Sequence, residues 1–309
     1  MKWTAANIPP QAGKTALITG ANSGIGYQAA LELARAGAHV LVGVRDATKG
    51  AAAVAQIRAA VPQASVEVAV VDVASLASIR AFAEGFAQHG VALDILINNA
   101  GVMAIKDREL TVDGFEKQMG TNHLGHFALT GLLLPQLLAS RDEASPRVVT
   151  VASLAHRGGA IEIDNLNAET GYTAWGAYNN SKLANILFAR ELHRRLQGRA
   201  LSLKSLAVHP GISKTNIFQN GVKGKDFKSV FMSIFGGPLM QNDAMGALPT
   251  LFAAVAPEAR GGQYIGPDGF MEFKGSPAVV EPRAQALDAE MGRKLWEKSE
   301  ELTGVTYGL

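Results

Sequence analysis

Short apolar runs alternate with longer stretches of helical spacing along the chain, and this alternation restricts the possible folds more than any other feature. The runs are rich in Val, Ile and Leu without a polar residue at every second position. Such runs are typical of parallel strands that helices cover on both faces. The pattern therefore predicts repeated strand–helix–strand units in a doubly wound, mostly parallel α/β sheet.

Seven strands and five long helices are expected from this pattern. The strands are expected at 15–19, 39–44, 65–71, 94–97, 147–152, 203–208 and 263–265. The helices are expected at 25–36, 47–60, 75–89, 112–138 and 177–196.

No composition shift or internal repeat marks a second domain in the 309 residues. One α/β domain is therefore expected over 14–276, with an N-terminal arm at 1–13 and a charged, helical C-terminal appendage at 277–309. The segment 213–247 is rich in Gly, Phe, Met and Lys and follows the end of a strand. Because ligands bind beyond the carboxyl ends of strands in open α/β sheets, we predict a lid there over a bulky, hydrophobic substrate. Peripheral membrane contact is the alternative.

Charge and composition exclude several classes of function. The net charge is only +2, from 29 basic and 27 acidic residues, and no segment forms the Lys/Arg stripe that nucleic acid binding requires. With no cysteine, the chain has no disulfide and no thiolate metal site. No apolar stretch is long enough for a transmembrane helix. A cytoplasmic protein acting on a small molecule is expected, and a homo-oligomer stays open.

The turn after the first expected strand is rich in glycine and leads straight into a helix. Glycines there allow a tight turn and close approach of the backbone to a pyrophosphate, which the helix N-terminus attracts. A plain strand–helix connection is the alternative for such a turn taken alone. The residues predicted to bind the phosphates are Gly20, Asn22, Ser23, Gly24, Ile25 and Gly26.

Arg45 ends the second expected strand, where NAD-specific proteins usually place a carboxylate. Its guanidinium can hold a 2′-phosphate through charge-assisted hydrogen bonds, which favours NADP(H) over NAD(H). Asp46 is the alternative ribose acid, although it also suits a helix N-cap. Asp72 has the same two interpretations, adenine contact or helix cap. Further cofactor contacts are expected at Val73, Asn99, Ala100 and Gly101.

Tyr178 and Lys182 are four residues apart, so a helix places them on one face, one turn apart. An ammonium near a phenol favours the phenolate and lowers the phenol pKa toward the range that is useful in acid–base catalysis. Taken alone, such a pair usually belongs to a solvated helix face. Ser153 ends the fifth expected strand, at the same sheet edge as the glycine turn, where its hydroxyl can donate to a substrate oxygen.

Four motifs occur in a fixed order along the chain: the glycine turn, the Asn-Asn-Ala-Gly segment 98–101, the strand-end Ser153 and the Tyr-x-x-x-Lys pair. In these motifs and their order the chain resembles the short-chain dehydrogenase/reductase family, and the resemblance covers nearly its whole length. The resemblance implies a single Rossmann-like domain that binds NAD(P). It also implies a catalytic tetrad in which Tyr is the acid/base, Ser orients the carbonyl, Lys holds ribose and lowers the Tyr pKa, and Asn supports a water relay. The tetrad residues would be Asn122, Ser153, Tyr178 and Lys182.

The turn at 210–215 is similar to the family turn that meets the nicotinamide carboxamide. It adds four expected cofactor contacts, namely Pro210, Gly211, Ile212 and Thr215. The stretches at 121–127, 153–156, 164–167 and 181–185 resemble the retinol-dehydrogenase-like and protochlorophyllide-reductase-like group. Two departures stand against those exact activities, since the chain has no membrane anchor of the retinol type and no Cys for light-driven reduction.

Interconversion of a carbonyl and an alcohol on a bulky hydrophobic substrate, with NADP(H), is the function that these features predict. The predicted substrate contacts are His156, His209, Phe218 and Phe231. No metal site is expected, because His123 and His126 have no third ligand and hydride chemistry of this type requires no metal. The alternative is a catalytically silent dinucleotide sensor or scaffold on the same fold, although such a protein could dispense with the Ser, Tyr and Lys.

Overall fold

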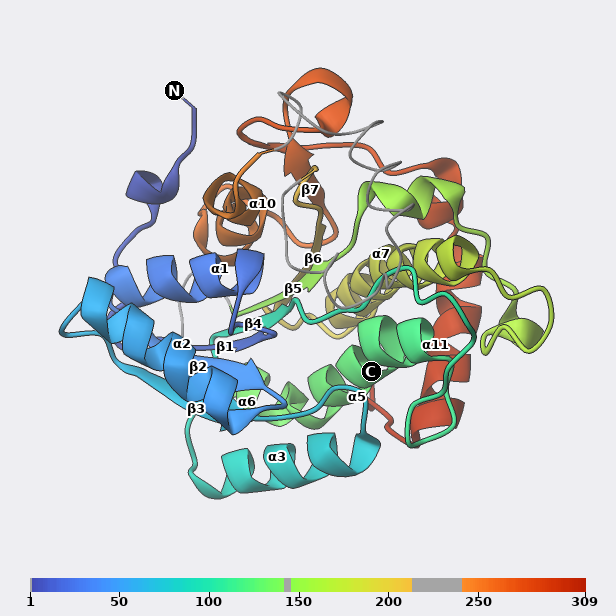
Figure 1. The fold of residues 1–309 in the computed structure, drawn as a ribbon, viewed down its shortest axis with the longest axis horizontal. Helices are drawn as coiled ribbons and strands as arrows, with labels where there is room; N and C mark the ends of the chain where they lie inside the picture. The colour runs from blue at the N-terminus through green and yellow to red at the C-terminus, as the bar shows by residue number, and fades with distance from the viewer. Residues whose placement is uncertain (1, 142–145, 213–240) are drawn as a thin grey trace.

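The structure is a computed structural model, and it describes residues 2–141, 146–212 and 241–309. Its centre is one eight-stranded sheet in the order β3-β2-β1-β4-β5-β6-β7-β8 (Figure 1). The strands are β1 (Thr15–Thr19), β2 (His39–Val44), β3 (Val66–Val70), β4 (Ile95–Asn98), β5 (Arg147–Val151), β6 (Lys204–Val208), β7 (Tyr264–Pro267) and β8 (Pro277–Val279).

The expected mostly parallel α/β sheet is confirmed, but the strand count of seven is corrected to eight among the described residues. All pairings are parallel except the last, in which β8 runs antiparallel to β7. β8 covers only three residues, and its first residue, Pro277, lies opposite Pro267. Because proline is confined to strand ends and edges, so short an edge strand leaves no recognisable apolar run in the sequence.

Helices cover both faces of the sheet (Figure 1). One face carries α1 (Gly24–Arg35), α2 (Ala47–Ala60) and α10 (Asp243–Val255), whose apolar residues share one buried core. The other face carries α3 (Leu76–Gln88), α5 (Gly125–Leu132), α6 (Leu134–Leu138), α7 (Ala174–Gly198) and α11 (Ala289–Thr303). This is the doubly wound arrangement that the sequence predicts.

The helix expected at 112–138 begins later and is not continuous. It starts at α4 (Lys117–Met119), where the Glu116 carboxylate accepts hydrogen bonds from two backbone amides of the first turn. A π-helical turn follows at Gly120–Leu124, then α5, and then α6 with Pro135 in its first turn. π-turns inside helices frequently occur at functional sites. Here the turn contains the predicted tetrad residue Asn122.

The predicted C-terminal appendage, 277–309, contains the strand β8 as well as helix α11. α11 packs along α7, and its Trp296 is only 2% exposed. The Trp296 ring contacts the rings of Phe127, Phe188 and Tyr307. The end of the chain is therefore part of the core on this face of the sheet. Within the described ranges, no helix is both long and apolar enough to span a membrane.

Candidate active site

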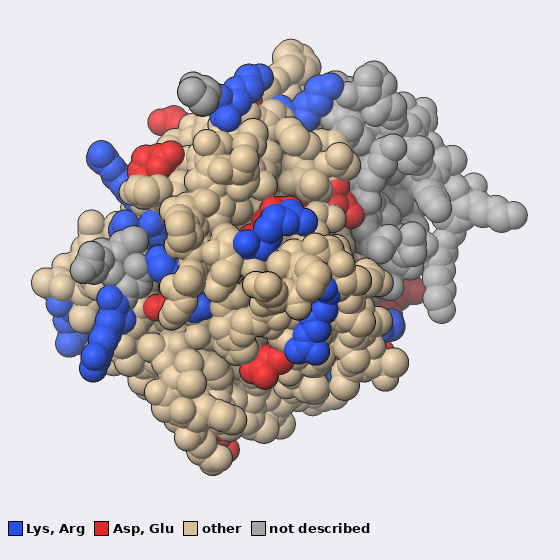
Figure 2. Space-filling model, turned by 90° about the vertical axis from the view of Figure 1, so that its left-hand side faces the viewer, with Lys and Arg blue, Asp and Glu red and all other residues tan. Residues whose placement is uncertain are grey.

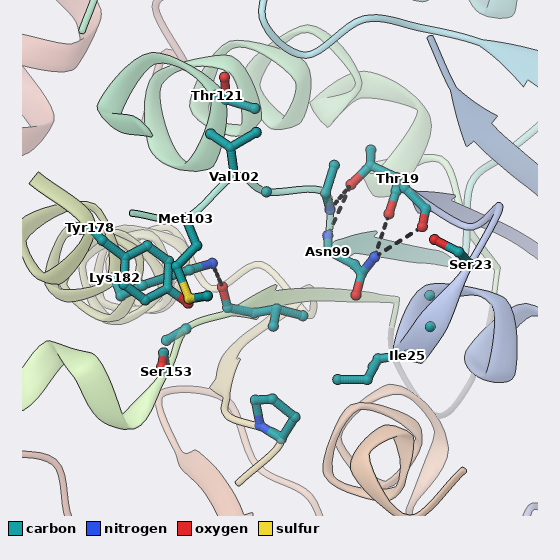
Figure 3. Close-up of a pocket in the computed structure, with 18 of the residues that line it drawn as sticks. Thr19, Ser23, Ile25, Asn99, Val102, Met103, Thr121, Ser153, Tyr178 and Lys182 are labelled. Carbon is teal, nitrogen blue, oxygen red and sulfur yellow. Dashed lines mark hydrogen bonds between the residues drawn. The ribbon is translucent and has the colours of Figure 1, made fainter. Parts of the chain in front are cut away.

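A cavity of about 770 Å³ lies at the carboxyl ends of the strands (Figure 3). At this point β1 and β4 are neighbours in the sheet, but the connections that follow them run in opposite directions. Ligands of doubly wound sheets bind at this switch point. Of the residues predicted to bind cofactor or to act in catalysis, the cavity lining contains Gly20, Asn22, Ser23, Gly24, Ile25, Gly26, Arg45, Asp72, Val73, Asn99, Ala100, Gly101, Ser153, Tyr178, Lys182, Pro210, Gly211 and Ile212.

The glycine turn lines the cavity, and its backbone has a conformation that residues other than glycine adopt only with strain. Gly20 and Gly24 have positive φ angles of 67° and 59°. A Cβ atom on Gly26 would lie 2.5 Å from the side-chain nitrogen of Asn99 and 2.6 Å from the carbonyl oxygen of Gly20. Ser23 is the N-cap residue of α1, but its hydroxyl makes no capping hydrogen bond within the described chain. The first amides of α1 are therefore not capped by this side chain, as expected for a helix N-terminus that binds a phosphate.

The segment after β4 is fixed against this turn by hydrogen bonds. Thr19 Oγ1 accepts from the backbone N–H of Asn99 at 2.9 Å and of Ala100 at 3.0 Å, and Asn99 Nδ2 donates to the Thr19 carbonyl at 2.8 Å (Figure 3). Small side chains and backbone thus form this wall of the cavity, so a flat ring system can lie against it.

At the far end of the cavity lie two cations and two carboxylates. Arg45 is exposed and lines the cavity, as does Lys49 in the first turn of α2. Asp46 is the N-cap of α2 and accepts from the backbone N–H of Thr48 and of Lys49, so the capping interpretation is confirmed.

Asp72, which also lines this end, accepts from the backbone N–H of Ala74 at 2.9 Å. The cap of α3 is Ser75 instead. The helix-cap interpretation of Asp72 is therefore wrong, and its side chain closes the turn before the helix.

Ser153, Tyr178 and Lys182 meet at the opposite end, as Figure 3 shows. Ser153 is the N-cap of the 3₁₀ helix Leu154–Gly158, and its hydroxyl lies within hydrogen-bonding reach of Tyr178. Lys182 Nζ donates to the carbonyl of Val151 at 3.0 Å and lies 5.8 Å from the centre of the Tyr178 ring. The helix α7 thus brings phenol and ammonium to one face, as the spacing predicts.

The ionisation of these groups is governed by burial. Burial raises the pKa of Tyr178 to about 12, although the hydrogen bond with Ser153 opposes part of the rise. Burial also lowers the pKa of Lys182 to about 8. The lowering of the Tyr178 pKa that we expected from Lys182 is not found, because burial governs this pKa and Ser153 is the group that opposes the rise. At neutral pH the phenol holds its proton, which is the form that donates to a carbonyl oxygen.

Asn122 is fully buried in the π-turn and is not among the cavity-lining residues. Its side chain accepts from the Val102 N–H at 2.8 Å and donates to the Val102 carbonyl at 3.0 Å and to Ser181 Oγ at 2.9 Å. The Asn122 side-chain oxygen would be 3.0 Å from a Cβ atom on Gly101. Asn122 therefore supports the cavity wall formed by 101–102 from behind.

His156 and His209, which we predicted to contact substrate, are not among the residues that line the cavity. Both are fully buried, and burial lowers the pKa of each. His156 Nδ1 donates to the Ser153 carbonyl at 2.7 Å, and His209 Nε2 lies 3.0 Å from a carboxylate oxygen of Glu272. The two rings therefore face the Ser153 carbonyl and the Glu272 carboxylate and not the interior of the cavity.

Several lining residues were missed by the sequence reasoning. Lys49 lies in the first turn of α2, four residues after Arg45, and a second cation so close in sequence to Arg45 is a signal that could have revealed it. Apart from Leu154, which belongs to the recognised stretch 153–156, the others come from segments with no recognisable motif, and only the fold brings them together. They are Met103, Leu154, Arg157, Trp175, Met271 and Phe273.

Three predicted contacts, Thr215, Phe218 and Phe231, lie outside the described residues, as does the expected lid at 213–240. The rest of that lid segment, 241–247, includes the start of α10. Of the histidines considered as metal ligands, His123 Nε2 contacts Ser299 Oγ, and His126 contacts Thr19 Oγ1 and the Asn122 carbonyl. Across 2–141, 146–212 and 241–309, no group of three metal-ligating side chains occurs.

The donors around the cavity suit a nicotinamide dinucleotide. The α1 N-terminus, with no side-chain cap, lines the cavity, and the close approach at Gly26 leaves no room for a side chain between turn and wall. The buried Lys182 ammonium and the backbone of 210–212 line the other end.

Comparisons with known proteins agree with this geometry. The sequence profile of the short chain dehydrogenase family matches residues 14–226. Human retinol dehydrogenase 13 is 42% identical over 97% of this chain and 86% of its own length, and mouse polyprenol dehydrogenase is 38% identical over 97% and 87%. A crystal structure of an uncharacterized protein from Mycobacterium paratuberculosis superposes with a TM-score of 0.81 at 42% identity, covering 100% of both chains. The chain therefore belongs to the short-chain dehydrogenases, in the retinol-dehydrogenase-like group, and is an NAD(P)-dependent oxidoreductase.

Proposed function

We propose that the protein interconverts a bulky, hydrophobic carbonyl and its alcohol, with NADP(H) as the preferred cofactor. One observation carries the proposal. The same cavity has the cations Arg45 and Lys49 at one end and, at the other, the Ser153–Tyr178–Lys182 group beside apolar side chains.

The preference for NADP(H) follows from the charges at the ribose end. Arg45 and Lys49 can both reach a 2′-phosphate on the adenine ribose, and a guanidinium suits such a group because it donates in pairs. Asp46, the alternative ribose acceptor, already accepts two backbone hydrogen bonds of α2 through one of its oxygens. The arrangement therefore attracts an added phosphate more strongly than a free ribose hydroxyl.

The chain's own residues supply the proton and hold the substrate, while the bound cofactor supplies or accepts the hydride. The Tyr178 hydroxyl donates its proton to the carbonyl oxygen during reduction, and Ser153 donates a hydrogen bond to the same oxygen. The Lys182 ammonium holds the ribose hydroxyls and stabilises the negative charge that develops on the phenolic oxygen. Asn122 keeps Val102, and with it this wall of the cavity, in place.

The substrate class follows from the apolar side chains beside the catalytic group. They are Met103, Leu154, Trp175, Met271 and Phe273. Cavities of this kind bind apolar ligands and use few polar groups to orient them. Retinol and polyprenol, which appear in the names of two relatives, are hydrophobic isoprenoid alcohols, and this supports the same class here.

The test is a panel of aldehydes and alcohols that share one reacting group and differ in the length of their apolar chain. Each is assayed with NADPH or NADP⁺ and with the non-phosphorylated cofactors, following the nicotinamide absorbance. The proposal predicts that kcat/KM rises with apolar length and is higher with the phosphorylated cofactor. Turnover that is equal for short and long substrates, or higher with NADH, would contradict it.

A further inference from the structure

The turn between β7 and β8, residues 270–273, stands at the mouth of the cavity and contributes Met271 and Phe273 to its lining. We call it the 270–273 turn. Phe270 and Met271 are 77% and 55% exposed, so little packing of their own side chains holds them in place. Their positions must therefore be set by other contacts of the turn.

The backbone of this turn is strained. Met271 and Glu272 have positive φ angles of 51° and 61°, in the left-handed region that favours glycine. Residues other than glycine adopt this conformation at an energetic cost, and it persists only where surrounding contacts compensate for it.

The compensating contacts converge on the Glu272 carboxylate. Arg157 Nη2 donates to its Oε1 at 2.7 Å, and the buried His209 Nε2 lies 3.0 Å from its Oε2. His209 Nδ1 accepts from the Gly211 N–H at 3.2 Å, which leaves the ring proton on Nε2; Nε2 lies close to the carboxylate, but the pair does not have the geometry of a hydrogen bond. Although burial alone would raise it, the contacts of His209 and Arg157 hold the pKa of Glu272 below its usual value.

These contacts connect the 270–273 turn to both halves of the site. Arg157 belongs to the 3₁₀ helix that Ser153 caps, and His209 directly follows β6 and precedes the turn at 210–212. The Ile212 N–H donates to the Phe273 carbonyl at 2.8 Å, and a Cβ atom on Gly211 would collide with that same oxygen. One carboxylate therefore joins three segments that border the substrate end of the cavity.

We infer that Glu272 is a positioning residue that gives the enzyme its selectivity for long apolar substrates. It holds Met271 and Phe273 in the part of the cavity that receives the substrate chain beyond the reacting carbon. The inference rests on the proposed function for its substrate class. A short carbonyl compound reaches Ser153 and Tyr178 without touching the 270–273 turn, whereas a long one depends on it.

The first test compares Glu272→Gln with wild type on a short and a long aldehyde with the same reacting group. Loss of one charge-assisted contact lowers the long-to-short ratio of kcat/KM by about tenfold or more, chiefly through KM for the long aldehyde. Glu297→Gln is the matched control, because Glu297 is also paired with an arginine but lies on the exposed face of α11. An unchanged ratio in Glu272→Gln would overturn the inference.

A double-mutant cycle separates the role of the ion pair from general damage to the fold. Arg157→Met and Glu272→Gln are combined, and the change in the substrate ratio is compared with the sum of the single changes. A shared role predicts that the second substitution adds little to the first. Fully additive effects would mean that the two residues act independently, and this would contradict the inference.

Hydrogen exchange tests the positioning role without using turnover. In Glu272→Gln the amides of Glu272, Phe273 and Ile212 exchange about tenfold faster, while those of α7 keep their wild-type rates. If wild type shows no preference for the long aldehyde, the proposed function fails, but faster exchange still identifies Glu272 as the residue that holds the turn. Unchanged exchange at all three amides would refute the positioning role itself.

Discussion

Arg45 shows how one exposed side chain can decide the choice of cofactor. It follows β2 directly and lines the cavity together with Lys49, which lies in the first turn of α2. Its position at a strand end could be predicted from sequence, because the register of a parallel strand places its last residue at the binding edge.

Replacing Arg45 with Asp is expected to reverse the cofactor preference. A carboxylate repels a 2′-phosphate and accepts from free ribose hydroxyls, so the NADPH-to-NADH ratio of kcat/KM falls by about a hundredfold. Arg293→Asp, on the exposed face of α11, is the control and leaves the ratio at its wild-type value. A ratio unaffected by Arg45→Asp would remove Arg45 from cofactor selection.

For single residues, the sequence could not predict the direction in which a side chain points. His156 and His209 follow strands that end at the binding edge, and so they were predicted to contact substrate. Both rings instead turn under the site, toward the Ser153 carbonyl and the Glu272 carboxylate. Glu272 is more than sixty positions from His209 along the chain, and only the pairing of β7 with β6 and β8 brings the two together.

At the scale of elements, the strands and the glycine turn were the most predictable features. β1, β2 and α2 have the bounds that were expected, because each is a clear apolar or Ala-rich run between turn residues. The π-turn at Gly120–Leu124 could not be predicted, since its extra residue per turn depends on contacts that Asn122 and Gly125 make with other segments.

The contact between the glycine turn and the β4 segment makes a specific prediction for Gly26→Ala. Its Cβ would collide with Asn99 and with the Gly20 carbonyl, so the start of α1 must shift and the affinity for NADPH falls by about tenfold or more. Gly85→Ala is a matched control within α3, where a Cβ meets nothing within 4 Å, and it stabilises the helix by up to about 1 kcal/mol. Titration of NADPH fluorescence measures both variants. Wild-type affinity in Gly26→Ala would show that this close approach is not required.

At the scale of the whole molecule, the end of the chain completes the core on one face of the sheet. The Trp296 ring stacks with Phe188 and lies beneath Arg195, and the Tyr307 hydroxyl donates to the Phe127 carbonyl at 2.6 Å. Sequence patterning predicted a helix in this region, but the aromatic contacts join residues from three distant segments and could not be read from periodicity.

Trp296→Ala is therefore expected to lower the free energy of unfolding by about 3–5 kcal/mol, because it leaves a cavity among buried rings. Urea unfolding followed by circular dichroism measures the change. Leu287→Ala is the control, since Leu287 is 44% exposed and its loss costs about 0.5 kcal/mol or less. A cost below about 1 kcal/mol for Trp296→Ala would contradict this role for the C-terminal segment.

The central claim is that this fold places Tyr178 to transfer a proton while the cofactor transfers hydride, and single-turnover oxidation of NADPH with a long-chain aldehyde tests it most directly. In Tyr178→Phe the ring still packs against Trp175 and lines the cavity, but no hydroxyl remains to donate. We expect the single-turnover rate to fall by about 10²–10⁴-fold, while the Kd for NADPH stays within about twofold of wild type. A Tyr178→Phe variant that oxidises NADPH at a near-normal rate would show that another group donates the proton and would contradict the account.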